Sequence, residues 1–593
     1  MEIISLLTLS WILIVFVVLF FLLPQKLFPS SINTNFVNKI FNNTIYTSLV
    51  IILAANLLSK FHLFNWVTLL LCYFVWPTIY WLSKNLKNIN SLLREYIISK
   101  YLQLLDLLEF DNLQKAFSKY LFDIQEQYSS LLKIYITKIN FSNPITILAL
   151  SFFLITTSFI FILNFSEPIK ELRLPFTEGY QTLLETWQIL LGQTNQSKIM
   201  FLPAIIAAIS SLAATDPLHT VRFFSPLLLC LLVFLVGITI WRVTNYKGVG
   251  LVAIYLLGTN IFYWPIDNTL NSNKLPDSLL ETMYNIFQQV LSKPLFGEEN
   301  TLAFIFLLLA INFWNQILKE GRGDNFNRTL VNTLICLILV GLSFPLLLLP
   351  TFLTMIVLTI LPSLTLLIFS ISLIMLVLFF EINQVNNLTV VEVKFILPIA
   401  LTLLFAAVCQ FFIYSTRFIA IYYREPIITV LMVAISLVFL PEQPRKQYLE
   451  YDICTRKTLE IAQQFPKKQW LIIAPTEELA ISYGYGWYED LAIFTSKYQD
   501  KVKNSEFRFL FSLDTFIFVE KKPFAFFKQE AQYVPFSTLS DASYKNYRSL
   551  AGRASLEQQA LTLCETYREF HPEVKIYYED ENLRIYFIPK EKP

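Results

Sequence analysis

The residues of this chain whose types and spacing could do chemistry gather in one long insertion between hydrophobic segments, at residues 165–222. Glu178 supplies a carboxylate there, and Asp216, His219 and Arg222 follow at intervals of three residues. A carboxylate can take a proton from a hydroxyl group, and cationic side chains can stabilise a departing phosphate. Because hydrophobic segments flank the insertion, we expect this chemistry to act on a substrate that a lipid carries.

The composition indicates a protein that crosses a membrane many times. Of the 593 residues, 55% are hydrophobic and 15% are charged, and the mean hydropathy is +0.53. The formal net charge of +2 and the lack of a clustered basic face argue against a nucleic-acid partner. The apolar residues 3–23 have no basic start and no small-residue cleavage site, so we interpret them as a retained helix.

Hydrophobic segments of the length needed to cross a bilayer recur along the chain. We therefore expect an all-α polytopic membrane protein with about twelve transmembrane helices, followed by a C-terminal soluble α/β domain. The expected spans are residues 3–23, 43–59, 62–82, 145–164, 223–243, 248–264, 302–318, 329–344, 346–361, 363–380, 394–414 and 426–441. Prolines at 345 and 350 leave open whether that region is one long helix or two short ones.

Lysine and arginine in the short loops set the expected orientation, because such loops face the cytoplasm. Counted this way, residues 165–222, residues 265–300 and the tail lie outside, and the protein resides in a plasma membrane of the bacterial inner-membrane type. The expected domains are an N-terminal extension of three spans (1–83), a cytoplasmic amphipathic helical segment (84–144), a membrane core (145–441) and an extracytoplasmic α/β domain (442–593).

Two regions outside the spans have patterns of their own. Residues 84–144 repeat apolar and aromatic side chains at helical spacing, which is typical of a packing element or of a docking site for a protein partner. In the tail we expect a helix at 451–465, a strand at 469–474, alternating strand-like segments at 507–511 and 515–520, a helix at 556–570 and a hairpin of 575–578 with 584–588.

The cysteines divide between the spans and the tail. Cys72, Cys230, Cys336 and Cys409 lie within expected spans, where cysteine usually serves as a small apolar residue. Cys454 and Cys564 lie in the two expected tail helices and could form a disulfide if the tail is extracytoplasmic. Without paired Cys-x-x-Cys or His-x-x-x-His motifs, a zinc or haem site made of such ligands is not expected.

The long insertion also resembles part of a known family. Thr177 Glu178 Gly179 Tyr180, followed by an amphipathic stretch to Gly192, resembles the Asp-Glu-x-Tyr element and juxtamembrane helix of GT-C glycosyltransferases, the superfamily of protein mannosyltransferases and lipid A aminoarabinose transferases. Val221 Arg222 Phe223 Phe224 Ser225 is similar to that group's Val-Arg-x-x-Ser, and Asp277 resembles its second acidic position. The resemblance spans residues 145–300 and implies a GT-C-like core.

This resemblance implies an inverting transfer of a sugar from a polyprenyl-phosphate donor to an extracytoplasmic acceptor. Glu178 would be the base, and Asp277 would position the acceptor, hold a divalent cation or act as the base itself. Arg222 and His219 would meet the phosphate, and Asp216 and Tyr180 complete the expected substrate-binding set. Asp267 is a reserve acid, and besides the lipid-linked donor the expected partners are membrane lipids.

Position 177 departs from the family pattern, because Thr177 stands where the family has its leading Asp. Either Glu178 has taken over the role, or the register is shifted, or the activity has been lost. The last case favours a non-catalytic scaffold that binds partners through residues 84–144 and the outer domain. A transporter of lipid-linked saccharides is a third hypothesis, which the near absence of ionisable residues within the spans disfavours.

Overall fold

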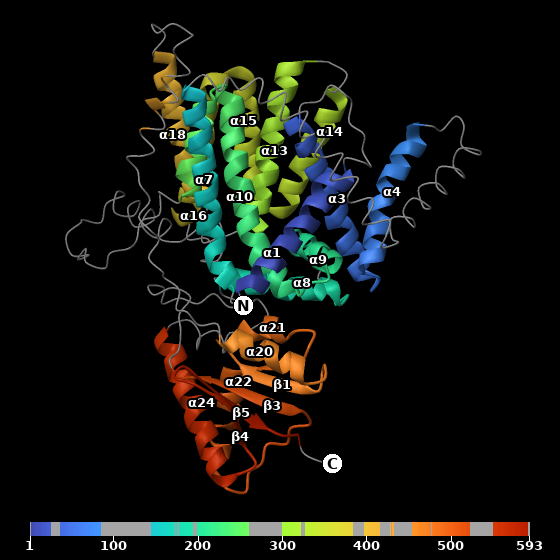
Figure 1. Cartoon of the computed structure of the whole chain (residues 1–593), viewed down its shortest axis with the longest axis vertical. Helices are drawn as coiled ribbons and strands as arrows, with labels where there is room; N and C mark the ends of the chain where they lie inside the picture. Colours follow the sequence, from blue (N-terminus) through green and yellow to red (C-terminus); the bar gives the residue numbers. More distant parts are fainter. Residues whose placement is uncertain are drawn as a thin grey trace, which may run out of the picture.

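A computed structural model shows a helical bundle with a small α/β domain at one end (Figure 1). The expected fold class is confirmed at this level. The structure describes residues 2–24, 36–84, 144–170, 172, 174, 177–193, 199–259, 299–321, 326–382, 396–415, 427, 430–431, 434, 453–475, 477–521 and 550–590.

The bundle consists of long apolar helices with shorter ones between them. Its elements are α1 (Glu2–Val17) with the π-helical turn η1 (Val18–Leu22), α3 (Phe36–Lys60), α4 (Trp66–Lys84), α7 (Pro144–Lys170), α8 (Thr177–Leu190), α9 (Leu202–Ala213), α10 (Pro217–Thr244), α11 (Lys247–Gly258), α13 (Glu299–Glu320), α14 (Phe326–Ser343), α15 (Leu348–Ile360), α16 (Thr365–Ile382) and α18 (Ile396–Ser415).

Within the described residues, eight helices are long and apolar enough to cross a membrane. They lie in α1 with η1, α3, α7, α10, α13, α14, α16 and α18. The spans expected at 248–264 and 346–361 correspond to α11 and α15, with 12 and 13 residues. The span expected at 62–82 corresponds to α4, whose side chains the structure describes over residues 66–75. The span expected at 426–441 lies almost entirely outside the described residues.

Proline separates the helices where the sequence left two possibilities open. α14 ends at Ser343, and Phe344 has φ −146° before Pro345 begins a short 3-10 turn that leads into α15. The same break recurs after α15, where Leu361 has φ −135° before Pro362. A residue that precedes proline is pushed out of the helical region, so each pair ends one helix and starts the next.

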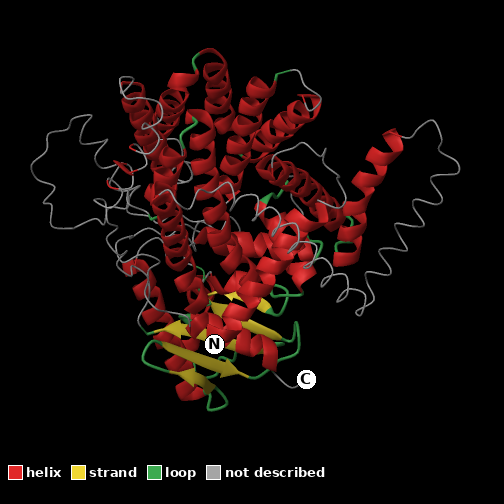
Figure 2. Cartoon of the chain, turned by 45° about the horizontal axis from the view of Figure 1, so that its top comes forward, coloured by secondary structure: helices red, strands yellow, loops and turns green. Residues whose placement is uncertain are grey.

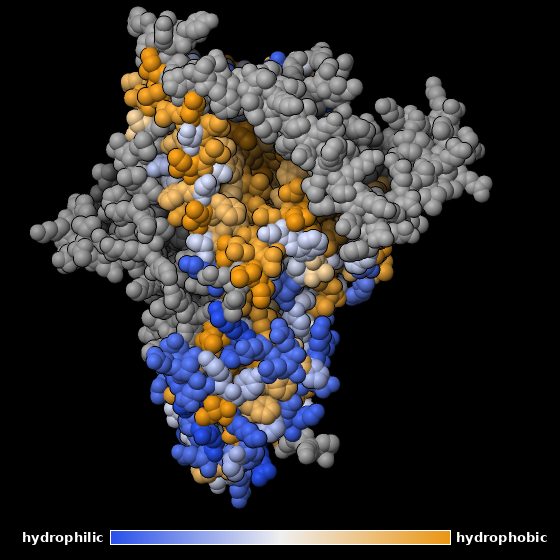
Figure 3. All heavy atoms as spheres, in the orientation of Figure 1, coloured by the Kyte–Doolittle hydropathy of each residue, from blue (hydrophilic) through white to orange (hydrophobic). Residues whose placement is uncertain are grey.

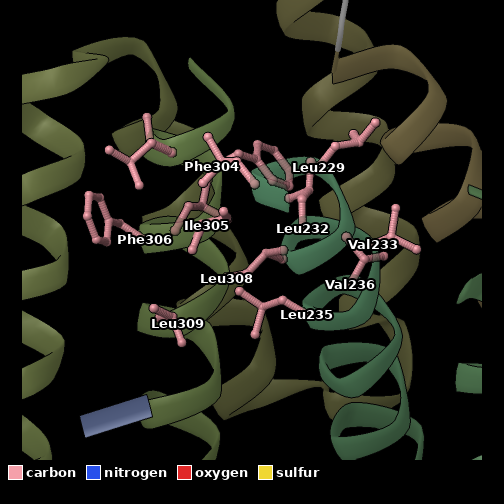
Figure 4. Packing of buried hydrophobic residues seen from close by; sticks show 14 of the residues in the cluster. Leu229, Leu232, Val233, Leu235, Val236, Phe304, Ile305, Phe306, Leu308 and Leu309 are labelled. Carbon is pink, nitrogen blue, oxygen red and sulfur yellow. The ribbon is translucent and has the colours of Figure 1, made fainter. Parts of the chain in front are cut away.

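The centre of the bundle is the parallel packing of α10 against α13. Leucine, valine and phenylalanine side chains of the two helices interlock there (Figure 4). Large apolar side chains are exposed on the outer helices, among them Ile155 on α7 and Leu349 on α15. Figure 3 shows the resulting hydrophobic surface over the bundle and a mostly hydrophilic surface over the α/β domain. This division suits a bundle that faces lipid and a domain that faces water.

Polar side chains join helices inside the half of the bundle that is remote from the α/β domain. The Asn332 amide donates to Asn42 Oδ1 between α14 and α3, and the Asn312 amide donates to Thr239 Oγ1 at 2.7 Å between α13 and α10. Arg242 Nη2 donates to Asn38 Oδ1 at 2.6 Å. Such interhelical hydrogen bonds hold membrane helices together, because the hydrophobic effect cannot do so within lipid.

The α/β domain is a mixed five-stranded sheet of order β2-β1-β3-β5-β4 with helices on both faces (Figure 2). Strand β1 pairs in parallel with β2 and β3, and β5 pairs antiparallel with β3 and β4. The elements are α20 (Ile453–Gln464), β1 (Trp470–Ala474), α21 (Glu477–Ser482), β2 (Trp487–Asp490), α22 (Leu491–Tyr498), β3 (Asp514–Glu520), α24 (Leu550–Phe570), β4 (Lys575–Glu579) and β5 (Leu583–Ile588).

Most of the elements expected in the tail are present. The two helices, the strands at 469–474 and 515–520 and the hairpin agree with α20, α24, β1, β3 and β4 with β5. The expectation of a strand at residues 507–511 is wrong, because these residues form an irregular segment whose aromatic rings pack together, with Phe509 and Phe511 stacked at 5.2 Å. The edge strand β2 was not foreseen, since its residues Trp487–Asp490 lack a hydrophobic alternation.

The sequence left open a disulfide between Cys454 and Cys564, and in the structure both cysteines are free and buried. Cys454 packs with Phe516 and Phe518, whereas Cys564 packs with Ile517 and Val519. Successive residues of a strand point to opposite faces of a sheet. The two thiols therefore lie on opposite sides of β3 and cannot reach one another.

Candidate functional site

The insertion that the sequence analysis singled out folds into two short helices, α8 and α9, at the end of the bundle that faces the α/β domain (Figure 1). Helix α8 buries Tyr180, Leu183 and Leu184. It ends where Gly192 adopts φ +68°, a left-handed conformation that glycine accepts without steric cost. The insertion is therefore packed structure between the membrane bundle and the outer domain.

Local hydrogen bonds build the turn from α9 into α10. We use this term for residues 213–222, which comprise the end of α9, the connection and the first residues of α10. Ala214 closes α9 in the left-handed region at φ 50°, which costs a non-glycine residue on the order of 1–2 kcal/mol. The Ser210 hydroxyl donates to the Thr215 carbonyl at 2.6 Å, and the hydroxyls of Thr215 and Thr220 are 3.1 Å apart. These bonds hold the short connection between α9 and the start of α10.

Asp216 begins α10 and has two hydrogen-bonding partners. Its Oδ1 accepts from the backbone N–H of Leu218 at 2.8 Å, so it is the N-cap of the helix, and Pro217 occupies the first helical position. Its Oδ2 accepts from the hydroxyl of Tyr485 at 2.5 Å. Burial and the negative charge of Asp216 raise the pKa of Tyr485, so the phenol stays protonated as the donor.

His219 and Arg222 follow Asp216 on the same face of α10, because three-residue steps return to nearly the same side of a helix. Arg222 is only 3% exposed, its Nη2 lies 3.4 Å from Ser5 Oγ and its guanidinium lies 4.4 Å from the centre of the Phe223 ring. Among the described residues, the buried Nδ1 of His219 has no hydrogen-bond partner. A cation and an imidazole thus adjoin the capped start of α10, where the helix dipole also favours an anion.

The first helix of the chain contacts this turn as well. The indole N–H of Trp11 in α1 donates to the carbonyl of Ala213 at 2.9 Å. That carbonyl belongs to the last turn of α9, whose carbonyls have no partner within the helix. Ser5 lies beside Arg222, so α1 contacts both arms of the turn, namely the end of α9 and the start of α10. The N-terminal extension is therefore part of the site.

The α/β domain reaches the same region through α21 and the loop that follows it. Ala480 and Ile481 of α21 are buried within the hydrophobic core of the bundle. The Tyr483 hydroxyl donates to Gln193 Oε1 at 2.7 Å, and the Tyr485 ring meets Trp187 of α8 edge-on at 5.2 Å. Gly484 has φ +86°, and a Cβ there would lie 3.3 Å from both Trp187 and Leu191. The loop can approach α8 this closely because the residue is glycine.

The structure brings some of the expected site residues together and separates others. Asp216, His219 and Arg222 share one face of the start of α10. Tyr180 is fully buried in α8, and its hydroxyl accepts from the backbone N–H of Leu174 at 3.3 Å. Glu178 lies in the first turn of α8, but its side chain lies outside the described part of the structure.

The remaining acids, Asp277 and Asp267, also lie outside the described residues. The prediction that Glu178 and Asp277 share one pocket therefore stays a prediction. Within the described residues, no group of three or more histidines, cysteines, aspartates or glutamates is placed to hold a metal ion.

Four residues that contact the site or its supports were not predicted from the sequence, namely Ser5, Trp11, Tyr483 and Tyr485. Ser5 and Trp11 gave no signal, because each lies in an apolar segment that reads only as a span. The alternation Tyr483 Gly484 Tyr485 Gly486 Trp487 was a usable signal, since glycines between aromatic residues mark a place where backbone or rings pack closely.

Comparison with known proteins gives no relative: no protein-family model, no curated protein and no solved structure matches this chain.

Proposed function

We propose that this protein is a membrane glycosyltransferase that moves a sugar from a polyprenyl-phosphate-linked donor to an acceptor outside the cytoplasm. The resemblance of residues 145–300 to the GT-C superfamily motivates the proposal. One observation carries it further: α8, α9, the start of α10 and the α/β domain meet at one end of an apolar bundle. A donor with a lipid tail would present its phosphate and sugar at such a boundary.

The chemistry assigns a role to each residue. Glu178 would take the proton of the acceptor hydroxyl, and Asp277 would orient the acceptor or share that role. Arg222 and His219 would meet the donor phosphate beside the start of α10, where positive charge stabilises the leaving group. A divalent cation held by Glu178 or Asp277 is the alternative source of that charge.

The orientation belongs to the same proposal. Arg242 and Lys319 lie at the end of α10 remote from the α/β domain, where Lys319 Nζ donates to the Arg242 carbonyl at 2.8 Å. If these cations face the cytoplasm, the α/β domain and α8 face outward. The protein would then act at the outer face of a plasma membrane of the bacterial inner-membrane type.

The decisive experiment is a transfer assay in membranes with radiolabelled lipid-linked sugars. Glu178→Gln and Asp277→Asn, made separately, are expected to abolish transfer with normal amounts of folded protein. Glu185→Gln is the matched control, because Glu185 lies on the same helix and its carboxylate accepts from Gln181 at 3.0 Å. Full transfer activity in both acid variants would remove the assignment as an enzyme.

A non-catalytic scaffold is the second candidate, and one observation favours it. Asp216 and Tyr180, both expected to bind substrate, already make structural contacts with Leu218, Tyr485 and Leu174. A scaffold would bind a protein partner through residues 84–144. Its expected signature is co-purification of the partner that requires residues 84–144 and is unchanged by Glu178→Gln and Asp277→Asn.

A further inference from the structure

We infer that Trp11 of the first helix and Tyr485 of the α/β domain are positioning residues: together they hold the turn of residues 213–222 in place and thereby orient Arg222 and His219 toward the donor. The part of this inference that concerns the donor rests on the proposed function. The part that concerns the turn is independent of any activity.

The contact from α1 fixes the first arm of the turn. Trp11 donates to the Ala213 carbonyl at 2.9 Å, at the point where α9 ends. The neighbouring Ala214 is in the left-handed conformation, and the bond from Trp11 adds a long-range contact to the local hydrogen bonds that hold the backbone there. Phe16 of the same helix meets Phe224 of α10 edge-on at 5.8 Å, and this contact holds α1 along the second arm.

The contact from the α/β domain fixes the start of the second arm. Tyr485 donates to Asp216, the residue that caps α10 and precedes His219 by three positions. The hydrogen bond is strengthened by the charge of the carboxylate. Its donor belongs to a domain that is anchored by Ala480 and Ile481 in the core of the bundle, so the bond links domain docking to the geometry of the turn.

These two contacts come from residues separated from the turn by 202 and 269 positions of sequence. No other described element supplies a side-chain hydrogen bond to the backbone of Ala213 or to the carboxylate of Asp216. Loosening the α/β domain would therefore release Asp216, and movement of α1 would release the end of α9. Either change would disturb the direction in which α10 presents Arg222.

The first test measures backbone hydrogen exchange in the full-length protein in lipid nanodiscs, followed in a peptide that covers residues 210–222. Tyr485→Phe keeps the ring against Trp187 and removes only the donor, and we expect exchange in the turn to rise about tenfold, since loss of a hydrogen bond to a charged group has that size. Trp11→Phe removes a neutral hydrogen bond, and we expect a rise of about threefold.

Tyr483→Phe is the matched control, because it removes a hydroxyl of the same loop whose partner is Gln193 rather than the turn. Exchange at residues 210–222 in this variant is expected to equal that of the wild-type protein. Unchanged exchange in both Tyr485→Phe and Trp11→Phe would overturn the inference, as would an equal rise in Tyr483→Phe.

The second test measures transfer kinetics with the lipid-linked donor. Tyr485→Phe and Trp11→Phe are expected to raise the KM for the donor more than they lower kcat, and Tyr483→Phe is expected to change neither. Raised exchange with an unchanged donor KM in an active enzyme would refute the positioning role. If the wild-type protein transfers no sugar, the proposed function falls, and the exchange experiment alone decides whether the turn is held as inferred.

Discussion

Tyr485 donates a hydrogen bond to Asp216 across 269 positions of sequence, and this bond ties the α/β domain to the N-cap of α10. The same carboxylate caps the helix through Leu218. One side chain therefore serves a local element and a contact between domains at once.

Removing the side-chain oxygens of Asp216 gives the first prediction. Asp216→Ala should lower the free energy of unfolding by about 1–2 kcal/mol, because it removes the helix cap along with the partner of Tyr485. Asp216→Asn keeps an oxygen for the cap and for the phenol, so its loss should stay below about 1 kcal/mol. Thermal unfolding in detergent measures both losses, and equal losses in the two variants would mean that neither the cap nor the bond to Tyr485 contributes.

The second prediction concerns the crossing of α10 and α11. A Cβ added at Gly250 would lie 2.6 Å from the carbonyl oxygen of Gly237, and backbone cannot move aside as a side-chain end can. Gly250→Ala should therefore destabilise the bundle by about 1–3 kcal/mol.

Gly341→Ala is the control for this crossing, since a Cβ there would meet only the tip of Leu348 at 3.1 Å. Thermal unfolding should show a clearly lower midpoint for the Gly250 variant than for the Gly341 variant. Equal midpoints would contradict the close approach of the two helices.

The third prediction concerns the ion pair inside the α/β domain. Arg553 and Glu520 bond at 3.0 Å, with side chains 3% and 2% exposed. Arg553→Met should cost about 3–5 kcal/mol, because it leaves a buried carboxylate without its cation. Adding Glu520→Gln to the Arg553→Met variant should recover part of the lost stability, because it removes the unpaired buried charge.

Lys503→Ala provides the comparison for a pair at the surface, where solvent screens the bond between Lys503 and Asp500 so that its loss should hardly change stability. Limited proteolysis of the α/β domain in the full-length protein ranks the variants. Equal protease resistance in the Arg553 and Lys503 variants would rule out a structural role for the buried pair.

The fourth prediction concerns pH. Hydrogen bonds from Lys521 and Arg584 lower the pKa of Glu579 from 4.5 to about 2. Because the folded-state pKa lies below the ordinary value, the stabilisation is complete above about pH 4.5 and is lost as the pH falls toward 2. This pH-dependent stabilisation should be small, because Glu579 lies at the surface, where solvent screens its charge.

Glu579→Gln should remove this part of the pH dependence, so that the unfolding midpoints of variant and wild type converge between pH 4.5 and 2. Circular dichroism of the full-length protein measures both midpoints. Parallel curves throughout the acid range would show that the carboxylate contributes no pH-dependent stability.

Composition and local pattern determined much of this protein by themselves. The apolar segments near the length of a bilayer predicted the long helices, because a backbone in lipid must satisfy its own hydrogen bonds. Alternating residues at 515–520 and the hairpin at 575–588 predicted β3, β4 and β5. The span expected at 223–243 begins earlier in the structure, at Pro217, so the shared helix face of Asp216, His219 and Arg222 was not predicted.

Only the tertiary structure decided what these elements meet. Sequence could not show that Cys454 and Cys564 lie on opposite faces of β3, because the placement of helices over a sheet depends on the whole core. Nor could it pair Trp11 with Ala213 or Tyr485 with Asp216, since contacts between distant segments form only when the chain packs. Local spacing determines which residues share a helix face, whereas tertiary packing determines which side chains contact that face.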